Sequence, residues 1–132
     1  FSSRWNCMLR YLFSRARFTS SPEEPLLEGK AFPQSPEHRV IAGIAGTPLE
    51  RLHLFAEIEF GSSQYDDVLG ERRLGSWWTA RLGGEVKVDE RVTVQARIEN
   101  LFDEEVATGL SSSGLRSIGQ PRSAWINVNY RF

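Results

Sequence analysis

Acidic side chains are the most conspicuous candidates for binding chemistry in this chain of 132 residues. Asp66 and Asp67 are adjacent, and residues 103–105 read Asp-Glu-Glu. Carboxylate oxygens are ligands that calcium prefers, so either group could in principle hold that ion at a protein surface. Neither group, however, has the D-x-D-x-D-G-x5-E spacing of a calcium loop. We therefore expect both groups to be solvated charges of surface loops.

Nucleophilic and metal-ligating side chains form no recognisable catalytic pattern. Residues 111–113 are all serine, and His38 and His53 are the only histidines, but no G-x-S-x-G motif places a nucleophile. Cys7 is the only cysteine, which excludes an intramolecular disulfide and a cysteine-based metal cluster. The formal net charge of -1 provides no overall basic field for nucleic acid. The sequence therefore predicts no enzyme, no metal site, no cofactor and no nucleic-acid partner.

The elements that position these side chains are predicted to be β-strands, because apolar and polar residues alternate over most of the length. Each run would form a strand with one apolar face and one polar or charged face. The clear runs are RLHLFAEIEF (51–60), SWWTARLGGEVKV (76–88), RVTVQARIEN (91–100) and SAWINVNYRF (123–132). Weaker runs are WNCMLRYLFSRARF (5–18) and HRVIAGIAG (38–46).

The connections between these six runs alternate in length. The segments TPLE and DE are tight turns, whereas the other three connections are long, rich in Ser, Gly, Pro and charge, and without helical periodicity. This order places every long loop at one edge of the sheet, which is typical of an outer-membrane barrel. The runs also reach the roughly 9–11 residues that a tilted strand needs to cross a bilayer.

A membrane barrel is favoured over the main alternative, a small soluble β-barrel or sandwich that acts as a binding module. The hydrophobic share of 40% does not separate the two, because a barrel wall faces lipid on one side and water on the other. A membrane-spanning helix is excluded, since no run of about 18 apolar residues exists. The soluble alternative predicts that the apolar faces of all six strands converge on one internal core.

Three stretches resemble segments of the TonB-dependent outer-membrane receptors. RIENLFDEE resembles the NLFD segment that opens the last extracellular loop of that family. IGQPRSAWINVNYRF resembles the closing segment, in which Gly-x-Pro-Arg precedes a last strand that ends on Phe. LEGKAFPQSPEHRV resembles the G-K-x-x-P-x-x-P-x-H stretch that enters an earlier strand. Their order fits the C-terminal part of the family's barrel and covers nearly the whole chain.

The resemblance implies an all-β fold, namely an antiparallel up-and-down transmembrane β-barrel segment of about six strands. The family's barrel has 22 strands and a plugged lumen, and six strands cannot close on themselves in lipid. We therefore expect residues 1–132 to be one C-terminal barrel segment, a piece of a longer chain, with the plug domain absent. A truncated receptor without function is the remaining alternative.

The resemblance also implies a function, a location and partners. The function is TonB-dependent uptake of a bulky nutrient, such as a ferric siderophore or cobalamin, across the bacterial outer membrane. The implied partners are the remainder of the receptor, the energy-transducing TonB complex through the missing N-terminal part, the barrel-assembly machinery and outer-membrane lipid.

Particular residues acquire expected roles from the resemblance and the alternation together. Phe132, Tyr130 and Val128 would form a C-terminal assembly signal, and Trp78 and Tyr130 would be aromatics at the lipid interface. Trp77 would point to the opposite face from Trp78. Side chains expected to face the lumen are Glu57, Glu59, Arg81, Glu85, Arg97, Asn129 and Arg131. Within the strand at 76–88, Gly83 and Gly84 would relieve crowding in the barrel wall.

Overall fold

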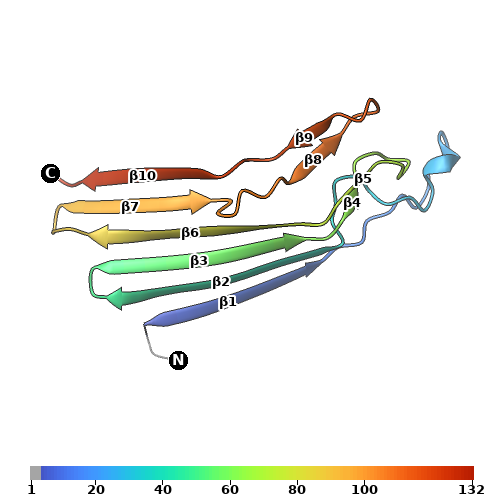
Figure 1. Cartoon of the computed structure of the whole chain (residues 1–132). Coiled ribbons are helices and arrows are strands. Elements are labelled where there is room, and N and C mark those ends of the chain that lie inside the picture. The colour runs from blue at the N-terminus through green and yellow to red at the C-terminus, as the bar shows by residue number, and fades with distance from the viewer. Residues whose placement is uncertain (1–3) are drawn as a thin grey trace.

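Six long strands form one antiparallel sheet in the order in which they occur along the chain. The computed structural model describes residues 4–132, so the first three residues of the predicted segment 1–132 lie outside the described residues. The strands are β1 (Trp5–Phe13), β2 (His38–Leu49), β3 (Leu52–Gly61), β6 (Trp77–Lys87), β7 (Val92–Glu99) and β10 (Ser123–Tyr130). Figure 1 shows this up-and-down arrangement, which confirms the predicted fold class.

The two ends of the sheet differ, as the connection lengths predict. Both short turns lie at one end, and the first, second and third long loops (residues 14–37, 62–76 and 100–122) lie at the other end (Figure 1). These loops contain the 3-10 helix η1 (Pro25–Leu27) and two small strand pairs, β4 (Gln64–Tyr65) with β5 (Arg73–Leu74) and β8 (Ala107–Leu110) with β9 (Arg116–Ile118). The sequence did not predict these pairs, because such short segments show too little periodicity.

Two strand boundaries differ from the prediction. The segment TPLE was expected to be a turn, but β2 continues through Thr47 and Pro48 to Leu49, with an irregularity in its register after Gly46. Proline lacks a backbone N–H and is tolerated where a bulge interrupts the ladder. At the other terminus β10 ends at Tyr130 and not at the last residue.

The cross-strand register gives the sheet two different faces. On one face Glu57 of β3 lies opposite Arg81 of β6, and Glu85 of β6 lies opposite Gln95 of β7. On the other face Leu82 lies between Ala56 and Ile98. We call these the polar face and the apolar face. Their separation confirms the alternation read from the sequence.

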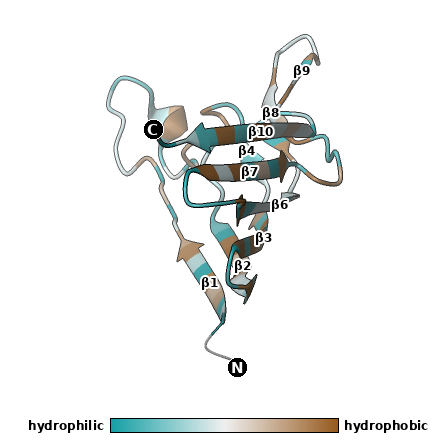
Figure 2. Cartoon of the chain, turned by 90° about the vertical axis from the view of Figure 1, so that its left-hand side faces the viewer, coloured by the Kyte–Doolittle hydropathy of each residue, from teal (hydrophilic) through white to brown (hydrophobic). Residues whose placement is uncertain are grey.

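The apolar face is not covered by a second layer of the described chain. Figure 2 views the sheet from the end with the short turns and shows one curved layer. Leu74, in a loop, is the only buried hydrophobic residue among residues 4–132. Large side chains of the apolar face are exposed, among them Leu9, Ile44, Ile58, Leu82, Ile126 and Val128. The internal core that a soluble sandwich requires is therefore not found in the described part of the chain.

No helix among residues 4–132 is long and apolar enough to cross a membrane.

Candidate functional site

Charged side chains of the polar face pair with one another across neighbouring strands. Arg81 forms an ion pair with Glu57, and Arg39 of β2 forms one with Glu59. The amide Nε2 of Gln95 donates a hydrogen bond of 2.7 Å to Glu85. These pairings bring cations and anions together on the polar face, so their charges compensate each other.

The polar face continues onto β7 and β10. Arg97 Nε lies 2.9 Å from Glu99 Oε1, and the Arg97 guanidinium lies 4.8 Å from the centre of the Trp125 ring, at cation–π distance. Asn129 lies opposite Thr93 in the register, and Arg131 follows the end of β10 with its N–H donating to Arg91 O at 2.9 Å. The structure thus brings the strand residues expected to face the lumen onto one face. That this face borders a lumen remains a prediction.

Aromatic side chains mark both ends of the apolar face. Trp78 lies at the end with the long loops, where its ring centroid is 5.2 Å from that of Phe102. Tyr130 lies at the end with the short turns, and its ring meets that of Phe132 edge-on at 5.2 Å. Trp77 occupies the polar face, where its indole covers Gly61. The opposite orientation of the two tryptophans agrees with the sequence, and contact of Trp78 and Tyr130 with lipid remains a prediction.

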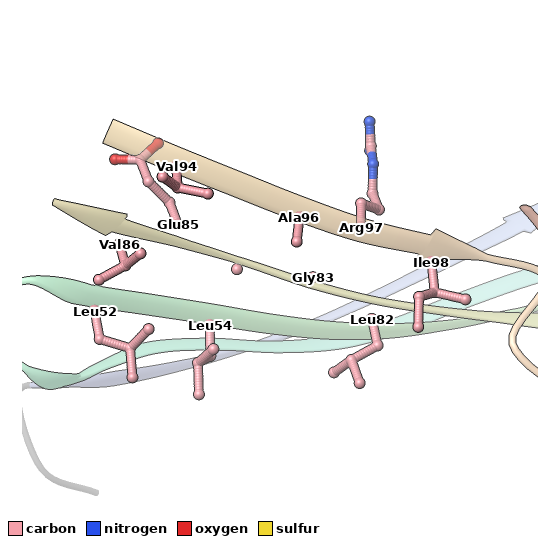
Figure 3. A pocket seen from close by; sticks show the side chains of 11 residues that line it. Leu52, Leu54, Leu82, Gly83, Glu85, Val86, Val94, Ala96, Arg97 and Ile98 are labelled. Atoms are coloured by element: carbon pink, nitrogen blue, oxygen red, sulfur yellow. The ribbon is translucent and has the colours of Figure 1, made fainter. Parts of the chain in front are cut away.

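A shallow apolar groove of about 330 Å³ runs over β3, β6 and β7. Figure 3 shows that Leu52, Leu54 and Leu82 project to one side of the sheet, whereas Glu85 and Arg97 project to the other. The groove exists because Gly84 and Ala96, which lie opposite each other, leave space between larger neighbours. Ligand pockets usually combine apolar walls with a few placed polar groups, and this groove has only the apolar walls.

The two adjacent glycines of β6 are required by close approaches on both faces. A Cβ atom at Gly83 would lie 2.6 Å from the Phe55 ring and 2.9 Å from the backbone oxygen of Ala96. A Cβ atom at Gly84 would lie 2.7 Å from Leu54 Cδ2. The predicted relief of crowding is confirmed.

The prediction that Asp66 and Asp67 are solvated charges is wrong. Asp67 is buried, and its carboxylate accepts hydrogen bonds from the backbone N–H groups of Arg72 at 2.7 Å and Glu71 at 3.1 Å. Burial alone would raise the pKa of Asp67, but these donations outweigh it and hold the pKa below its usual range. Hydrogen bonds from the Gln34 side chain and the Leu110 N–H likewise lower the pKa of Asp66. Both carboxylates are internal acceptors of the loop structure.

In the second acidic group, residues 103–105, Asp103 and Glu105 are exposed, as the sequence predicts. Asp103 accepts a hydrogen bond of 2.8 Å from the backbone N–H of Arg122, and Glu104 donates its N–H to the Asn100 side chain at 2.9 Å. Asn100 is buried, has a positive φ of 47°, and also donates to Gln120 O at 3.1 Å. It therefore joins the start of the third loop to its end. Sequence reasoning missed Asn100, although asparagine after a strand is a residue that tolerates this conformation.

The other candidate chemistry is not assembled. Ser111 Oγ lies 2.9 Å from Ser113 Oγ, whereas His38 Nδ1 lies 2.9 Å from the Tyr11 hydroxyl on the apolar face. Within residues 4–132 no group of three His, Cys, Asp or Glu side chains could hold a metal ion.

Comparison with known proteins gives one sequence relative and many structural ones. No protein-family model matches the chain. An alignment 79 residues long covers 55% of the chain and 13% of the vitamin B12 transporter BtuB of Vibrio vulnificus (strain YJ016), with 33% identity.

Solved structures match almost the whole chain. The ferric yersiniabactin uptake receptor FyuA from Yersinia pestis matches with a TM-score of 0.84 and 20% identity, over 100% of this chain and 22% of the receptor. The ferric citrate transporter FecA matches with a TM-score of 0.81 and 16% identity, over 98% of this chain and 21% of the transporter. The siderophore receptor PiuA from Acinetobacter baumannii matches with a TM-score of 0.78 and 20% identity, over 98% of this chain and 20% of the receptor. These proteins are transporters and receptors, and the chain spans about a fifth of each matched structure.

Proposed function

We propose that this chain, which has the barrel fold of TonB-dependent outer-membrane receptors, is a wall segment of a receptor that imports a bulky nutrient. In this proposal residues 1–132 are one barrel segment, and the plug domain lies elsewhere in the receptor. The segment has no complete transport path of its own.

The continuous exposed apolar face is the observation that carries this proposal. Soluble monomers rarely expose contiguous apolar patches larger than a few hundred Å². Here the apolar sides of β1, β2, β3, β6, β7 and β10 form one exposed surface, and no second layer of residues 4–132 covers it. Lipid tails would cover it, and the belt aromatics at its two ends would lie at the headgroups.

The free edges of the sheet support further strands as partners. Among residues 4–132, β1 has only β2 as a neighbour and β10 has only β7, so each outer strand has one edge that no described strand pairs with. Unpaired backbone N–H and C=O groups cost several kcal/mol each in hydrocarbon, which is why membrane barrels are closed. The remainder of the receptor would pair with these edges, and the paired charges of the polar face would border its wet lumen or plug.

The substrate class follows from the relatives and is part of the proposal. Their names include vitamin B12, ferric yersiniabactin and ferric citrate. We therefore expect a ferric siderophore or cobalamin as substrate, energy from the TonB complex, and a place in the bacterial outer membrane.

Uptake by cells with and without the full-length gene product tests the function. Cells are supplied with radioactive iron, complexed by catecholate, hydroxamate or citrate chelators, or with radiolabelled cobalamin. We expect uptake of at least one probe to need both the gene product and an energised inner membrane. Uptake that is unchanged for every probe after removal of the gene would contradict the proposal.

The last aromatics are proposed to be read by the barrel-assembly machinery. Phe132 is fully exposed and is held beside Tyr130 at the end of the sheet that carries the short turns, and Val128 lies on the same face. Replacing Phe132 with serine should remove most of the full-length protein from the outer-membrane fraction, whereas Phe132→Tyr should preserve its amount. Equal amounts of the serine and tyrosine variants, measured by immunoblot, would exclude this role.

A further inference from the structure

The carboxylate of Asp66 joins all three long loops. Asp66 belongs to the second loop, and its Oδ1 accepts a hydrogen bond of 2.9 Å from Nε2 of Gln34 in the first loop. Its Oδ2 accepts another of 2.9 Å from the backbone N–H of Leu110 in the third loop. One side chain therefore holds residues that lie 32 positions before it and 44 positions after it.

The environment of Asp66 makes these bonds strong. Only 13% of its side chain is exposed, and Arg72 Nε lies 4.0 Å from Oδ2. An ionised acceptor strengthens a hydrogen bond, and a poorly solvated carboxylate is costly to leave without donors. The backbone N–H of Asp66 also donates to Arg72 O at 2.8 Å, which fixes the residue within its own loop.

Gln34 is held in an unusual conformation to make its contacts. Its φ is 53°, which is uncommon for a residue other than glycine and persists only where neighbouring contacts enforce it. In this conformation its backbone N–H donates to Tyr65 O at 2.7 Å while its side chain reaches Asp66. The first and second loops are thus joined at two consecutive residues.

The loops have little internal structure that could hold them without these contacts. The pair β4 and β5 has two residues in each strand, and β8 and β9 have four and three. Isolated hairpins are marginally stable in water even when they are longer. In the structure β5 lies beside β8, so the contact at Asp66 is where the second and third loops meet (Figure 1).

We propose that Asp66 is a positioning residue that fixes the three long loops relative to one another for substrate capture. This rests on the proposed receptor function, because capture by the loops presupposes a substrate. Asp66 itself contacts the loops and needs no contact with the substrate.

The distance between the first and third loops tests the positioning role. Spin labels are attached to cysteines that replace Leu26 and Leu115, whose exposures are 79% and 73%, in the full-length protein reconstituted in lipid. The exposed Cys7 is replaced by serine in every variant. Asp66→Asn leaves one oxygen and introduces an N–H₂ group that faces a donor, so one loop is released. In pulsed electron paramagnetic resonance, we expect the distribution of distances between the two labels to be broader in Asp66→Asn than in the protein that keeps Asp66.

A double variant and a matched control make the test specific. In Asp66→Asn/Gln34→Glu the new amide donates to the new carboxylate and its oxygen still accepts from the Leu110 N–H, so the narrow distribution should return. Asp103→Asn makes the same chemical change at a carboxylate whose partner, Arg122, lies in the same loop. It should leave the distribution unchanged. The proposal would be overturned if Asp66→Asn kept the narrow distance distribution of the parent, or if the distribution stayed broad in the double variant.

Substrate binding separates this inference from the receptor function. Binding of the probe that the parent imports should weaken about tenfold in Asp66→Asn, as expected for loss of a hydrogen bond to a charged group, and recover in the double variant. Unchanged affinity despite released loops would overturn the role in capture. If the parent imports no probe but the distances respond as described, the receptor function fails while the positioning role of Asp66 stands.

Discussion

Replacing Leu82 with arginine is expected to destabilise the full-length protein by about 2–4 kcal/mol when it folds into a lipid bilayer. Leu82 lies in the middle of β6 on the apolar face, with 43% of its surface exposed. Its neighbours across the sheet are Ala56 and Ile98, which offer no counter-charge. Urea titration of protein folded into lipid vesicles, followed by tryptophan fluorescence, measures the change.

A charge on the opposite face supplies the control. Gln95→Arg places the same side chain on the polar face, where Glu85 already accepts a hydrogen bond from this position. The new pair should change stability by less than about 1 kcal/mol. If Leu82→Arg lowered the free energy of unfolding no more than Gln95→Arg does, Leu82 would face water, and the apolar face would not contact lipid.

The second large effect is expected at Gly83. Gly83→Val should lower the free energy of unfolding by about 1–3 kcal/mol, because the added side chain overpacks the site and forces its neighbours to move. The new Cβ would lie 2.6 Å from the Phe55 ring, and the backbone oxygen of Ala96, at 2.9 Å, cannot rotate away. Valine is otherwise favoured in strands, so intrinsic propensity predicts the opposite sign. The same urea titration distinguishes the loss of stability expected from overpacking from the gain expected from strand propensity.

Gly75→Val is the matched control for this variant. No atom lies within 4 Å of a Cβ built on Gly75, so valine there should be tolerated. Adding Phe55→Ala to Gly83→Val should recover part of the loss, since it removes the ring but not the backbone contact. A Gly83→Val protein as stable as its parent would show that the sheet can shift to admit the side chain.

The faces of the sheet could be predicted from the sequence because a strand has only two sides. Once Ile58 is assigned to the apolar face, Glu57 and Glu59 must lie on the polar face, whatever the strand pairs with. Chain-order pairing then brings Glu57 opposite Arg81 without any further information. The same rule separated Trp77 from Trp78.

The loop contacts could not be predicted in this way. Asp66 looked like one charge among several, because its acceptor role depends on Gln34 and Leu110, which no periodic pattern relates to it. The continuation of β2 through Pro48 could not be predicted either. A proline that follows glycine and threonine indicates a turn, and only the register with β3 shows that the strand continues.

The chain-order pairing of the strands has a consequence for how such a wall changes in evolution. Closing a flexible loop costs free energy that grows only with the logarithm of its length, so doubling a long loop adds about 0.6 kcal/mol. The turn between β2 and β3 and the turn between β6 and β7 set the register at the opposite end. Insertions and deletions in the long loops therefore leave these two pairings intact. In the proposed receptor, the loops can diverge in what they bind while β2 keeps β3 and β6 keeps β7 as its neighbour.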